Sequence, residues 1–297
     1  MRGLGMETGG ERQSATAARE RIISVSAAPY DGYDPAEAFE SLARVGATHV
    51  EPAFIVGYTE PFDESAFAPA QATAYRRLSE ASGLACTAMS SHIDLGLPDA
   101  VEVFTGRMRF AGAIGARIIA TNAAARARQA AFFANMDVLL RRAEEIGLTI
   151  ALENPGDGSD NLLDTAADGL ALVRRFGSDR LGLNYDAANT ASHRPALGDF
   201  AGDAIVAMPA CVHIHVKDLV RRESGWHFTP IGEGTIGCAR ILEAARDRPS
   251  MPISLELPLR LHRRPDAQPV RRPEPVPLAE IEDALRRSLA TVRSALK

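Results

Sequence analysis

The chain has 297 residues, of which 46% are hydrophobic and 24% charged, an ordinary composition for a soluble globular protein of one large domain or two small ones. Its net charge of −5 sets it apart from the strongly basic proteins that bind nucleic acid or anionic membranes, so we expect no nucleic-acid and no membrane partner. The three cysteines, Cys86, Cys211 and Cys238, form no CxxC pair, and no run approaches the roughly 18 apolar residues of a membrane span. We therefore expect a cytoplasmic protein.

Residues 1–20, MRGLGMETGGERQSATAARE, contain no apolar stretch of the kind that a secretory signal requires. We predict a disordered leader for them.

From residue 21 onward, short apolar runs alternate with longer amphipathic stretches such as 35–46, 130–147 and 164–177. The predicted strands are 21–27, 48–54, 84–91, 116–122, 148–154, 180–186, 211–217 and 252–258. Eight strand–helix units of about 30 residues each predict an α/β fold, a single-domain (β/α)8 TIM barrel over residues 21–258. A doubly wound sheet is the alternative, but the first strand is followed by APYDGYDPAE and not by a GxGxxG turn.

Two segments follow the last predicted strand. Residues 259–277 are rich in proline and arginine, which favours an extended linker; a loop that helps to cover a site at the carboxyl end of the barrel is the alternative. Residues 278–297 have the pattern of an amphipathic helix, and we expect it to pack on the outside of the barrel.

Four neighbouring strands end in side chains that bind metal ions. Glu153, Asp186, His215 and Glu256 end the fifth to eighth strands, and in a barrel of this kind the carboxyl ends of the strands carry the chemistry. Three carboxylates and one imidazole suit one divalent cation, with Mn²⁺, Mg²⁺ or Co²⁺ favoured and Zn²⁺ possible. The alternative is that each residue is separately exposed or ion-paired.

Five short motifs occur in a fixed order along residues 21–258: ALENP, LNYDAANT, HVKD, PIGEGTIG and SLELP. Their order and spacing resemble the xylose-isomerase-like sugar phosphate isomerase/epimerase superfamily. The resemblance implies a single divalent metal held by Glu153, Asp186, His215 and Glu256, the four residues already chosen at the strand ends. A homodimer would be unsurprising for this superfamily.

The resemblance also implies an enzyme that acts on a small polyhydroxylated carbonyl compound. Its reaction would be isomerisation or epimerisation through an enediolate, with Glu153 and Glu256 removing and returning a proton on opposite faces of the carbon. A metal-dependent dehydratase of the inosose or 3-dehydroshikimate type shares the same ligands and is the alternative. A binding protein without catalysis is the second alternative.

Eight further residues are candidates around this site. Those expected to contact substrate are His92, Lys217, Arg221, Glu51, Asn189 and Trp226, and those expected to support the ligands or their loop are His213 and Glu233. Each has a structural alternative, such as a surface ion pair for Lys217 and Glu51 or plain packing for Trp226. Asn189 and Ser159 stand where the ketose 3-epimerases of the superfamily carry histidine and glutamate, so we do not expect the substrate contacts of that subgroup.

Overall fold

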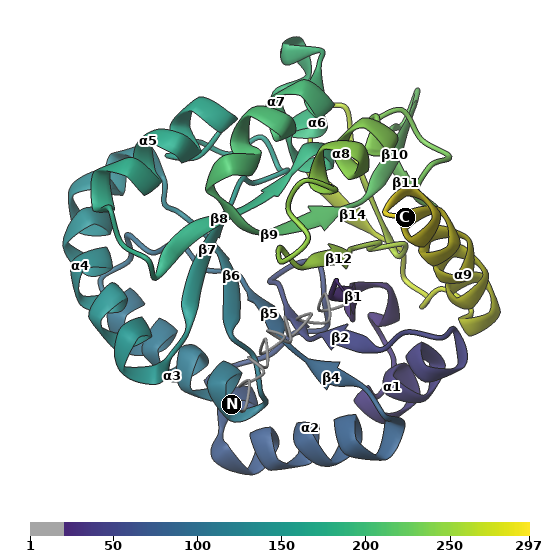
Figure 1. The fold of residues 1–297 in the computed structure, drawn as a ribbon, viewed down its shortest axis with the longest axis horizontal. Coiled ribbons are helices and arrows are strands. Elements are labelled where there is room, and N and C mark those ends of the chain that lie inside the picture. The colour runs from purple at the N-terminus through teal and green to yellow at the C-terminus, as the bar shows by residue number, and fades with distance from the viewer. Residues whose placement is uncertain (1–20) are drawn as a thin grey trace, which may run out of the picture.

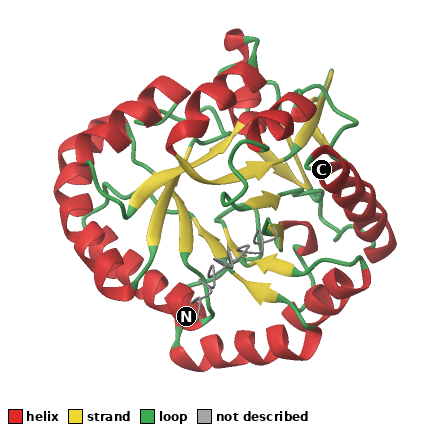
Figure 2. Ribbon diagram, in the orientation of Figure 1, coloured by secondary structure: helices red, strands yellow, loops and turns green. Residues whose placement is uncertain are grey.

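A computed structural model of the chain describes residues 21–297, so the leader predicted for residues 1–20 lies outside the described part. Within that part the parallel strands form a closed barrel surrounded by helices, which confirms the predicted TIM barrel (Figures 1 and 2). The barrel strands are β1 Ile23–Ser26, β2 His49–Glu51, β3 Ala53–Phe54, β4 Ala85–Cys86, β5 Ala88–Ser91, β6 Ile118–Asn122, β7 Thr149–Glu153, β8 Leu181–Asp186, β9 Cys211–Val216 and β12 Ile253–Leu255.

The second and third barrel strands are each divided into two short pieces. β2 pairs with β1 and β4, whereas β3 pairs with β5, so the two pieces on either side of Pro52 continue one strand. Proline has no backbone N–H to give to a ladder, which explains the interruption at this position. With β1 paired to β12 on its other side, the ring of eight strands is complete.

Nine helices occur within residues 21–297, in addition to short 3-10 turns. They are α1 Pro35–Arg44, α2 Pro69–Ser82, α3 Ala100–Ala113, α4 Gln129–Ile146, α5 Ala166–Phe176, α6 Ala187–His193, α7 Phe200–Ala207, α8 Cys238–Ala245 and α9 Leu278–Ala295. Local sequence sets their ends: α1 starts with a capping box between Asp34 and Glu37, and α4 stops at Gly147, whose φ of 80° favours glycine. None of these helices is long and apolar enough to cross a membrane.

The helix α9 packs on the outside of the barrel, as its sequence predicts. Its buried residues Ile281, Leu285, Leu289 and Val292 recur at helical spacing and face the barrel, and the helix contacts α1 and α8. Figure 1 shows α9 in the helix layer between α8 and α1. It thereby covers the place where the first and last strand–helix units meet.

A second sheet stands beyond the carboxyl ends of β9 and β12. Its four antiparallel strands are β10 Asp218–Arg222, β11 Gly225–Thr229, β13 Leu261–Arg263 and β14 Pro269–Arg271, in the order β10-β11-β13-β14. Two of these strands lie within residues 259–277, so our preferred interpretation of that segment as an extended linker is wrong. The local sequence does not indicate these strands, because β13 pairs with β11, which lies more than 30 residues earlier in the chain.

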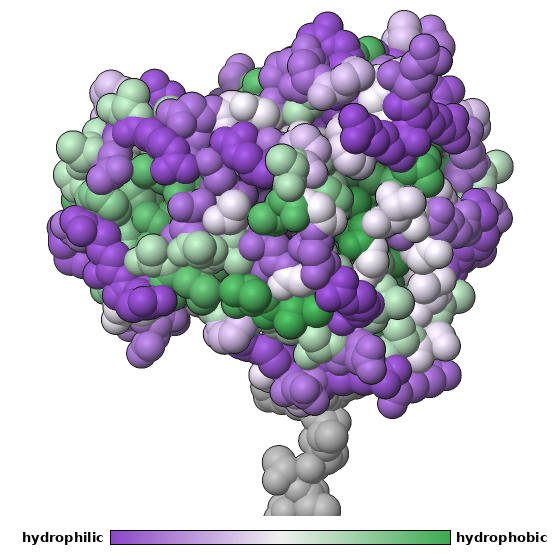
Figure 3. Space-filling view, turned by 90° about the horizontal axis from the view of Figure 1, so that it is seen from above, coloured by the Kyte–Doolittle hydropathy of each residue, from purple (hydrophilic) through white to green (hydrophobic). Residues whose placement is uncertain are grey.

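Figure 3 shows a face of the molecule on which hydrophilic side chains predominate and apolar ones gather in smaller groups. The large apolar side chains are mostly inside, and the only exposed ones within residues 21–297 are Val56, Leu97, Leu197 and Val206. The apolar core therefore gives a rigid frame, and the polar residues that it nevertheless buries are concentrated at the carboxyl end of the strands.

Candidate metal and substrate site

The four side chains at the strand ends meet in one cluster. Glu153 and Asp186 are the last residues of β7 and β8, His215 lies one residue before the end of β9, and Glu256 follows β12 directly. All four are buried, and one donor atom from each lies within 4.8 Å of the others. Their convergence follows from the parallel barrel, because every strand delivers its carboxyl end to the same rim.

Asp186 has one carboxylate oxygen committed to the fold and one directed to the cluster. Its Oδ1 accepts hydrogen bonds from the backbone N–H groups of Ala188 (2.8 Å) and Asn189 (3.0 Å) and so caps the start of α6. Its Oδ2 is buried and accepts no well-aligned hydrogen bond from any residue between 21 and 297, and the same holds for Oε2 of Glu256. The ammonium of Lys217 lies 2.8 Å from Asp186 Oδ2 and also pairs with Glu256.

The ring of His215 is fixed from behind by Glu51. His215 Nε2 lies 2.9 Å from Glu51 Oε1, which leaves Nδ1 facing the carboxylates of Glu153 and Glu256 at 3.2 Å each. Glu51 also accepts from Ser90 and is fully buried. Burial alone would raise the pKa of Glu51, but the His215 and His213 rings lower it to about 2, so this residue stays a carboxylate.

A second histidine lies one layer deeper, as expected for His213. Its Nδ1 is 2.9 Å from Asn184 Oδ1, and its Nε2 is 3.5 Å from Glu51 Oε2. Burial lowers the pKa of His213 to about 4, which keeps the ring neutral. Asn184 in turn donates to Glu153 Oε2 at 2.8 Å, so His213 supports the cluster through this amide.

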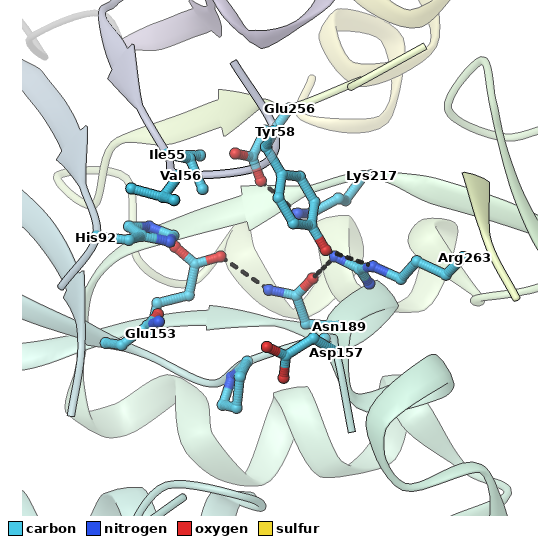
Figure 4. A pocket seen from close by; sticks show the side chains of 13 residues that line it. Ile55, Val56, Tyr58, His92, Glu153, Asp157, Asn189, Lys217, Glu256 and Arg263 are labelled. Atoms are coloured by element: carbon cyan, nitrogen blue, oxygen red, sulfur yellow. Dashed lines mark hydrogen bonds and ion pairs between the residues drawn. The ribbon is translucent and has the colours of Figure 1, made fainter. Parts of the chain in front are cut away.

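Above the cluster opens a cavity of about 140 Å³, shown in Figure 4. Glu153 and Glu256 reach into it from different sides, and Ile55 and Val56 form an apolar part of its rim. Three of the predicted substrate contacts line it, namely His92, Asn189 and Lys217. His92 Nε2 lies 3.1 Å from Glu153 Oε2, and Asn189 donates to the other oxygen of Glu153 at 2.9 Å.

The other predicted substrate contacts lie elsewhere. Glu51 is beneath the cavity and binds His215, which agrees with the alternative of a basic partner. Arg221 is exposed on β10, where its guanidinium stacks over Trp226 at 5.2 Å because the two residues are register partners. Our assignment of these three residues to substrate contact is therefore corrected.

The loop after β11 is ordered by Asp218 and not by Glu233. Glu233 is exposed and forms an ion pair of 2.7 Å with Arg287 of α9, which corrects its placement next to the ligands. The Asp218 carboxylate accepts hydrogen bonds from the backbone of Gly232, Gly234 and Ile236 at 3.0–3.1 Å. The motif PIGEGTIG thus owes its shape to backbone donors around one buried carboxylate.

Sequence reasoning missed Arg263, which enters the cavity from β13. Its side chain is buried, and it donates to Tyr58 Oη (2.9 Å), Ser192 Oγ (2.8 Å) and Asn189 Oδ1 (2.7 Å). The one signal in the sequence was the position of RLHRRP in the loop that follows the eighth strand. Tyr58 and Asn184 were also missed, and neither stands at a strand end.

The profile of a known family, described as "Xylose isomerase-like TIM barrel", matches residues 39–287. The chain belongs to this family. Among solved structures, this xylose isomerase-like barrel is similar to D-psicose 3-epimerase from Clostridium cellulolyticum H10, with a TM-score of 0.72, 14% identity, and coverage of 93% of this chain and 99% of that one.

Two further structures show the range of this likeness. An L-ribulose 3-epimerase has a TM-score of 0.67 and 18% identity, covering 93% of this chain and 94% of that one. The probable 3-DHS dehydratase AsbF from Bacillus anthracis has a TM-score of 0.66 and 12% identity, covering 92% and 98%. At such identities the likeness shows the fold alone. No curated protein matches the sequence.

The residues of this xylose isomerase-like barrel fit a divalent cation. Three carboxylates and one imidazole are a donor set for hard and borderline divalent ions. Two of the buried oxygens without well-aligned hydrogen bonds, Asp186 Oδ2 and Glu256 Oε2, face the cluster and leave acceptor capacity for an ion. The carboxylate behind His215 is the kind of partner that orients a metal-binding imidazole.

Proposed function

We propose that this chain is a divalent-metal-dependent isomerase or epimerase of a small polyhydroxylated carbonyl compound. The observation that carries the proposal is the buried cluster of Glu153, Asp186, His215 and Glu256 at the floor of a cavity on the carboxyl end of the barrel. We propose these four residues as ligands of one metal ion, with Mn²⁺, Mg²⁺ or Co²⁺ favoured. A bound divalent cation would polarise the substrate carbonyl and stabilise the negative charge that develops on it.

The chain itself would supply the proton transfers. Glu153 and Glu256 reach the cavity from different sides, so one can take a proton from the carbon next to the carbonyl while the other returns it (Figure 4). Burial would raise the pKa of Glu153, but His215 and His92 hold it well below its usual range, so Glu153 starts as a base. Hydrogen bonds from Asn184 and Asn189 fix both of its oxygens in place.

The remaining cavity residues would hold the substrate. His92, Asn189 and Lys217 present polar atoms to the cavity that suit hydroxyl and carbonyl oxygens. The similar structures support sugar chemistry, since one of them is a D-psicose 3-epimerase determined with D-tagatose. We place isomerisation or epimerisation first on this ground.

A dehydratase is the second candidate, favoured by the similarity to AsbF. It would begin with the same proton abstraction and then expel a hydroxyl group, so the cluster alone does not separate the two reactions. Incubation in D₂O separates them: an epimerase returns deuterated substrate and its epimer, whereas a dehydratase yields a product that has lost water.

The first experiment is metal analysis of the purified protein beside Glu153→Gln and His215→Ala. We expect about one divalent ion per chain in the wild type, a strong loss in both variants, and deuterium incorporation from D₂O into a ketose, an inosose or 3-dehydroshikimate only in the metal-loaded wild type. Glu233→Gln is the matched control, because Glu233 is exposed and pairs with Arg287 away from the cavity. A wild type that takes up none of Mn²⁺, Co²⁺ or Zn²⁺ would contradict the proposal and leave a non-catalytic binding protein.

A further inference from the structure

Arginine side chains from residues 259–277 reach into the barrel in two different ways. Arg260 and Arg271 bind carboxylates: Asp31 lies 3.3 Å from Arg260 and 2.6 Å from Arg271, and Glu60 pairs with both. Arg263 lies between them in sequence and is only 1% exposed, yet no carboxylate within residues 21–297 lies within ion-pair distance of it. The guanidinium without a counterion is therefore the most deeply buried of the three.

The direct contacts of Arg263 position the guanidinium but include no charged group. Its three hydrogen-bond partners, Tyr58, Ser192 and Asn189, are neutral, and the rings of Tyr58 and Phe228 lie 5.5 and 5.4 Å from it. Aromatic faces and neutral acceptors offset only part of the free energy that is lost when a charge leaves water. A buried cation of this kind is expected to have an anionic partner for part of its working cycle.

The guanidinium also has donors to spare at the cavity. An arginine carries five N–H groups, and each terminal nitrogen of Arg263 uses one of its two for Ser192 or Asn189. Figure 4 shows the side chain in the cavity wall beside Asn189 and Tyr58, on the same side as Lys217. Three carboxylates line the cavity. A metal ion would take Glu153 and Glu256, whereas Asp157 accepts hydrogen bonds from Ser159 and forms no ion pair with Arg263.

The loop after β7 packs closely against this guanidinium. A Cβ atom at Gly156 would lie 2.2 Å from Arg263 Nη1, so only glycine allows the loop after β7 to approach so closely. Gly156 lines the cavity, and its carbonyl accepts from Ser192, which in turn accepts from Arg263. Strand β13, the loop after β7 and helix α6 thus pack around one buried cation at the cavity.

We propose that the substrate carries a carboxylate or phosphate group and that Arg263 binds this anionic group while the metal cluster acts on the carbonyl end. This inference rests on the proposed function and narrows its substrate class to acidic polyhydroxylated carbonyl compounds. A planar guanidinium matches the oxygens of carboxylate and phosphate better than it matches a single hydroxyl group. Binding of such a remote group also supplies free energy that orients the reacting carbon.

The test compares acidic and neutral partners on the Mn²⁺-loaded full chain by calorimetric titration. D-fructose 6-phosphate against D-fructose tests phosphate, and D-glucuronate against D-glucose tests carboxylate. We expect at least one acidic member to bind about ten- to a hundred-fold more tightly than its neutral partner. Which pair shows the preference identifies the anionic group.

Three variants show whether Arg263 is responsible. Arg263→Gln should lose the preference for the acidic member. Arg263→Lys should keep a reduced preference, because lysine retains the charge but not the paired N–H donors of the planar guanidinium. Arg264→Gln is the matched control, since Arg264 is the next residue, is exposed and pairs with Asp266. If Arg263→Gln does not fold, the reduced preference of Arg263→Lys decides. Equal binding of acidic and neutral members by the wild type, or an unchanged preference in Arg263→Lys and Arg263→Gln, would overturn the inference.

Failure of this inference is distinguishable from failure of the proposed function. A protein that binds Mn²⁺ and exchanges deuterium into a neutral ketose, but shows no preference for acids, contradicts only the role of Arg263. A protein that binds no metal contradicts the proposed function, whereas the preference for acids is still measurable by titration of the metal-free chain.

Discussion

At the scale of single residues, Glu51 has the best-defined supporting role. It lies behind His215 at 2.9 Å, outside the cavity, and holds the imidazole with Nδ1 toward the carboxylates. Such outer partners set the orientation and basicity of a metal-binding imidazole. The polar residues in the barrel interior are therefore explained by the cluster above them, since His213 and Asn184 extend the same network.

Replacement of Glu51 should weaken metal binding without removing a ligand. Glu51→Gln has the same shape but no charge, and we expect metal affinity to fall about 10- to 100-fold while the fold is kept. Competition with a chelator of known affinity, followed by circular dichroism of the apo protein, measures both effects. Glu233→Gln serves again as the control. An affinity equal to that of the wild type would show that Glu51 only fills space.

At the scale of elements, α6 links the cluster to the loop after β7. The helix begins at the cap of Asp186 and ends at His193, whose Nε2 lies 2.8 Å from Asp164 Oδ1. His193 Nδ1 accepts a hydrogen bond from the backbone N–H of Gly158 at 3.1 Å. Only the neutral imidazole can accept this bond, so the neutral ring holds the loop. Gly156 and Asp157, which line the cavity, belong to the same loop.

This arrangement predicts a pH dependence of stability. Burial lowers the pKa of His193 from 6.5, and hydrogen bonding to Asp164 opposes the shift only in part. Below pH 6.5 the folded state therefore binds fewer protons than the unfolded state. The contribution of neutral His193 to the free energy of unfolding is complete above that pH and is lost as the pH falls. We expect the midpoint of thermal unfolding to drop between pH 7 and 5.5, and to drop less in His193→Gln.

Asp164 does not disturb this measurement. Burial would raise its pKa, but His193, Arg194 and Arg126 lower it, so its contribution is lost only at more acid pH. Equal pH profiles for wild type and His193→Gln would assign the dependence to other groups.

The small sheet depends on one buried carboxylate in the loop after β1. Asp31 accepts two hydrogen bonds from Arg271, at 2.6 and 2.8 Å, and a third from Arg260. Removal of one partner from a buried ion pair leaves the other charge unbalanced, which costs about 3 kcal/mol in comparable cases. These contacts anchor the segment that carries Arg263.

Asp31→Asn should therefore loosen residues 259–277. We expect the free energy of unfolding to fall by roughly 2–3 kcal/mol, because Glu60 retains part of the pairing. Limited proteolysis should cut the variant within this segment first. Asp266→Asn is the control, because it weakens an exposed pair with Arg264 and keeps a side-chain oxygen for the backbone N–H of Gln268. Cleavage at the same rate in both variants would show that Asp31 does not hold the sheet.

At the scale of the molecule, the barrel and its cluster of four candidate ligands could be predicted from the sequence for a physical reason. Strand order is regular in a parallel barrel, so four ligand-type residues at successive strand ends must meet, as Glu153 and Asp186 do. Arg263 could not be predicted, because its strand β13 pairs with β11 across a long separation. Arg221 was misplaced because the strand that carries it leaves the barrel and turns away with β11.

Metal binding at the proposed cluster would make the stability of the whole chain depend on the ion. Burial raises the pKa of Asp186, and the ion pair with Lys217 opposes this shift. The neighbouring carboxylates of Glu153 and Glu256 raise the pKa further. The close approach of these carboxylates in the apo protein therefore costs free energy. A cation that binds only the folded state stabilises it by about 2.7 kcal/mol at a concentration 100 times Kd.

Thermal unfolding should therefore shift by roughly 5 °C between EDTA and excess Mn²⁺. Glu256→Gln should melt at a lower temperature than the wild type in EDTA, because Lys217 and His215 lose a carboxylate partner, and it should gain little from Mn²⁺. The loss of the Mn²⁺ response in this variant separates binding at the cluster from a general effect of salt, which would move both proteins equally. Identical midpoints of the wild type in EDTA and in Mn²⁺ would contradict a metal site in the barrel.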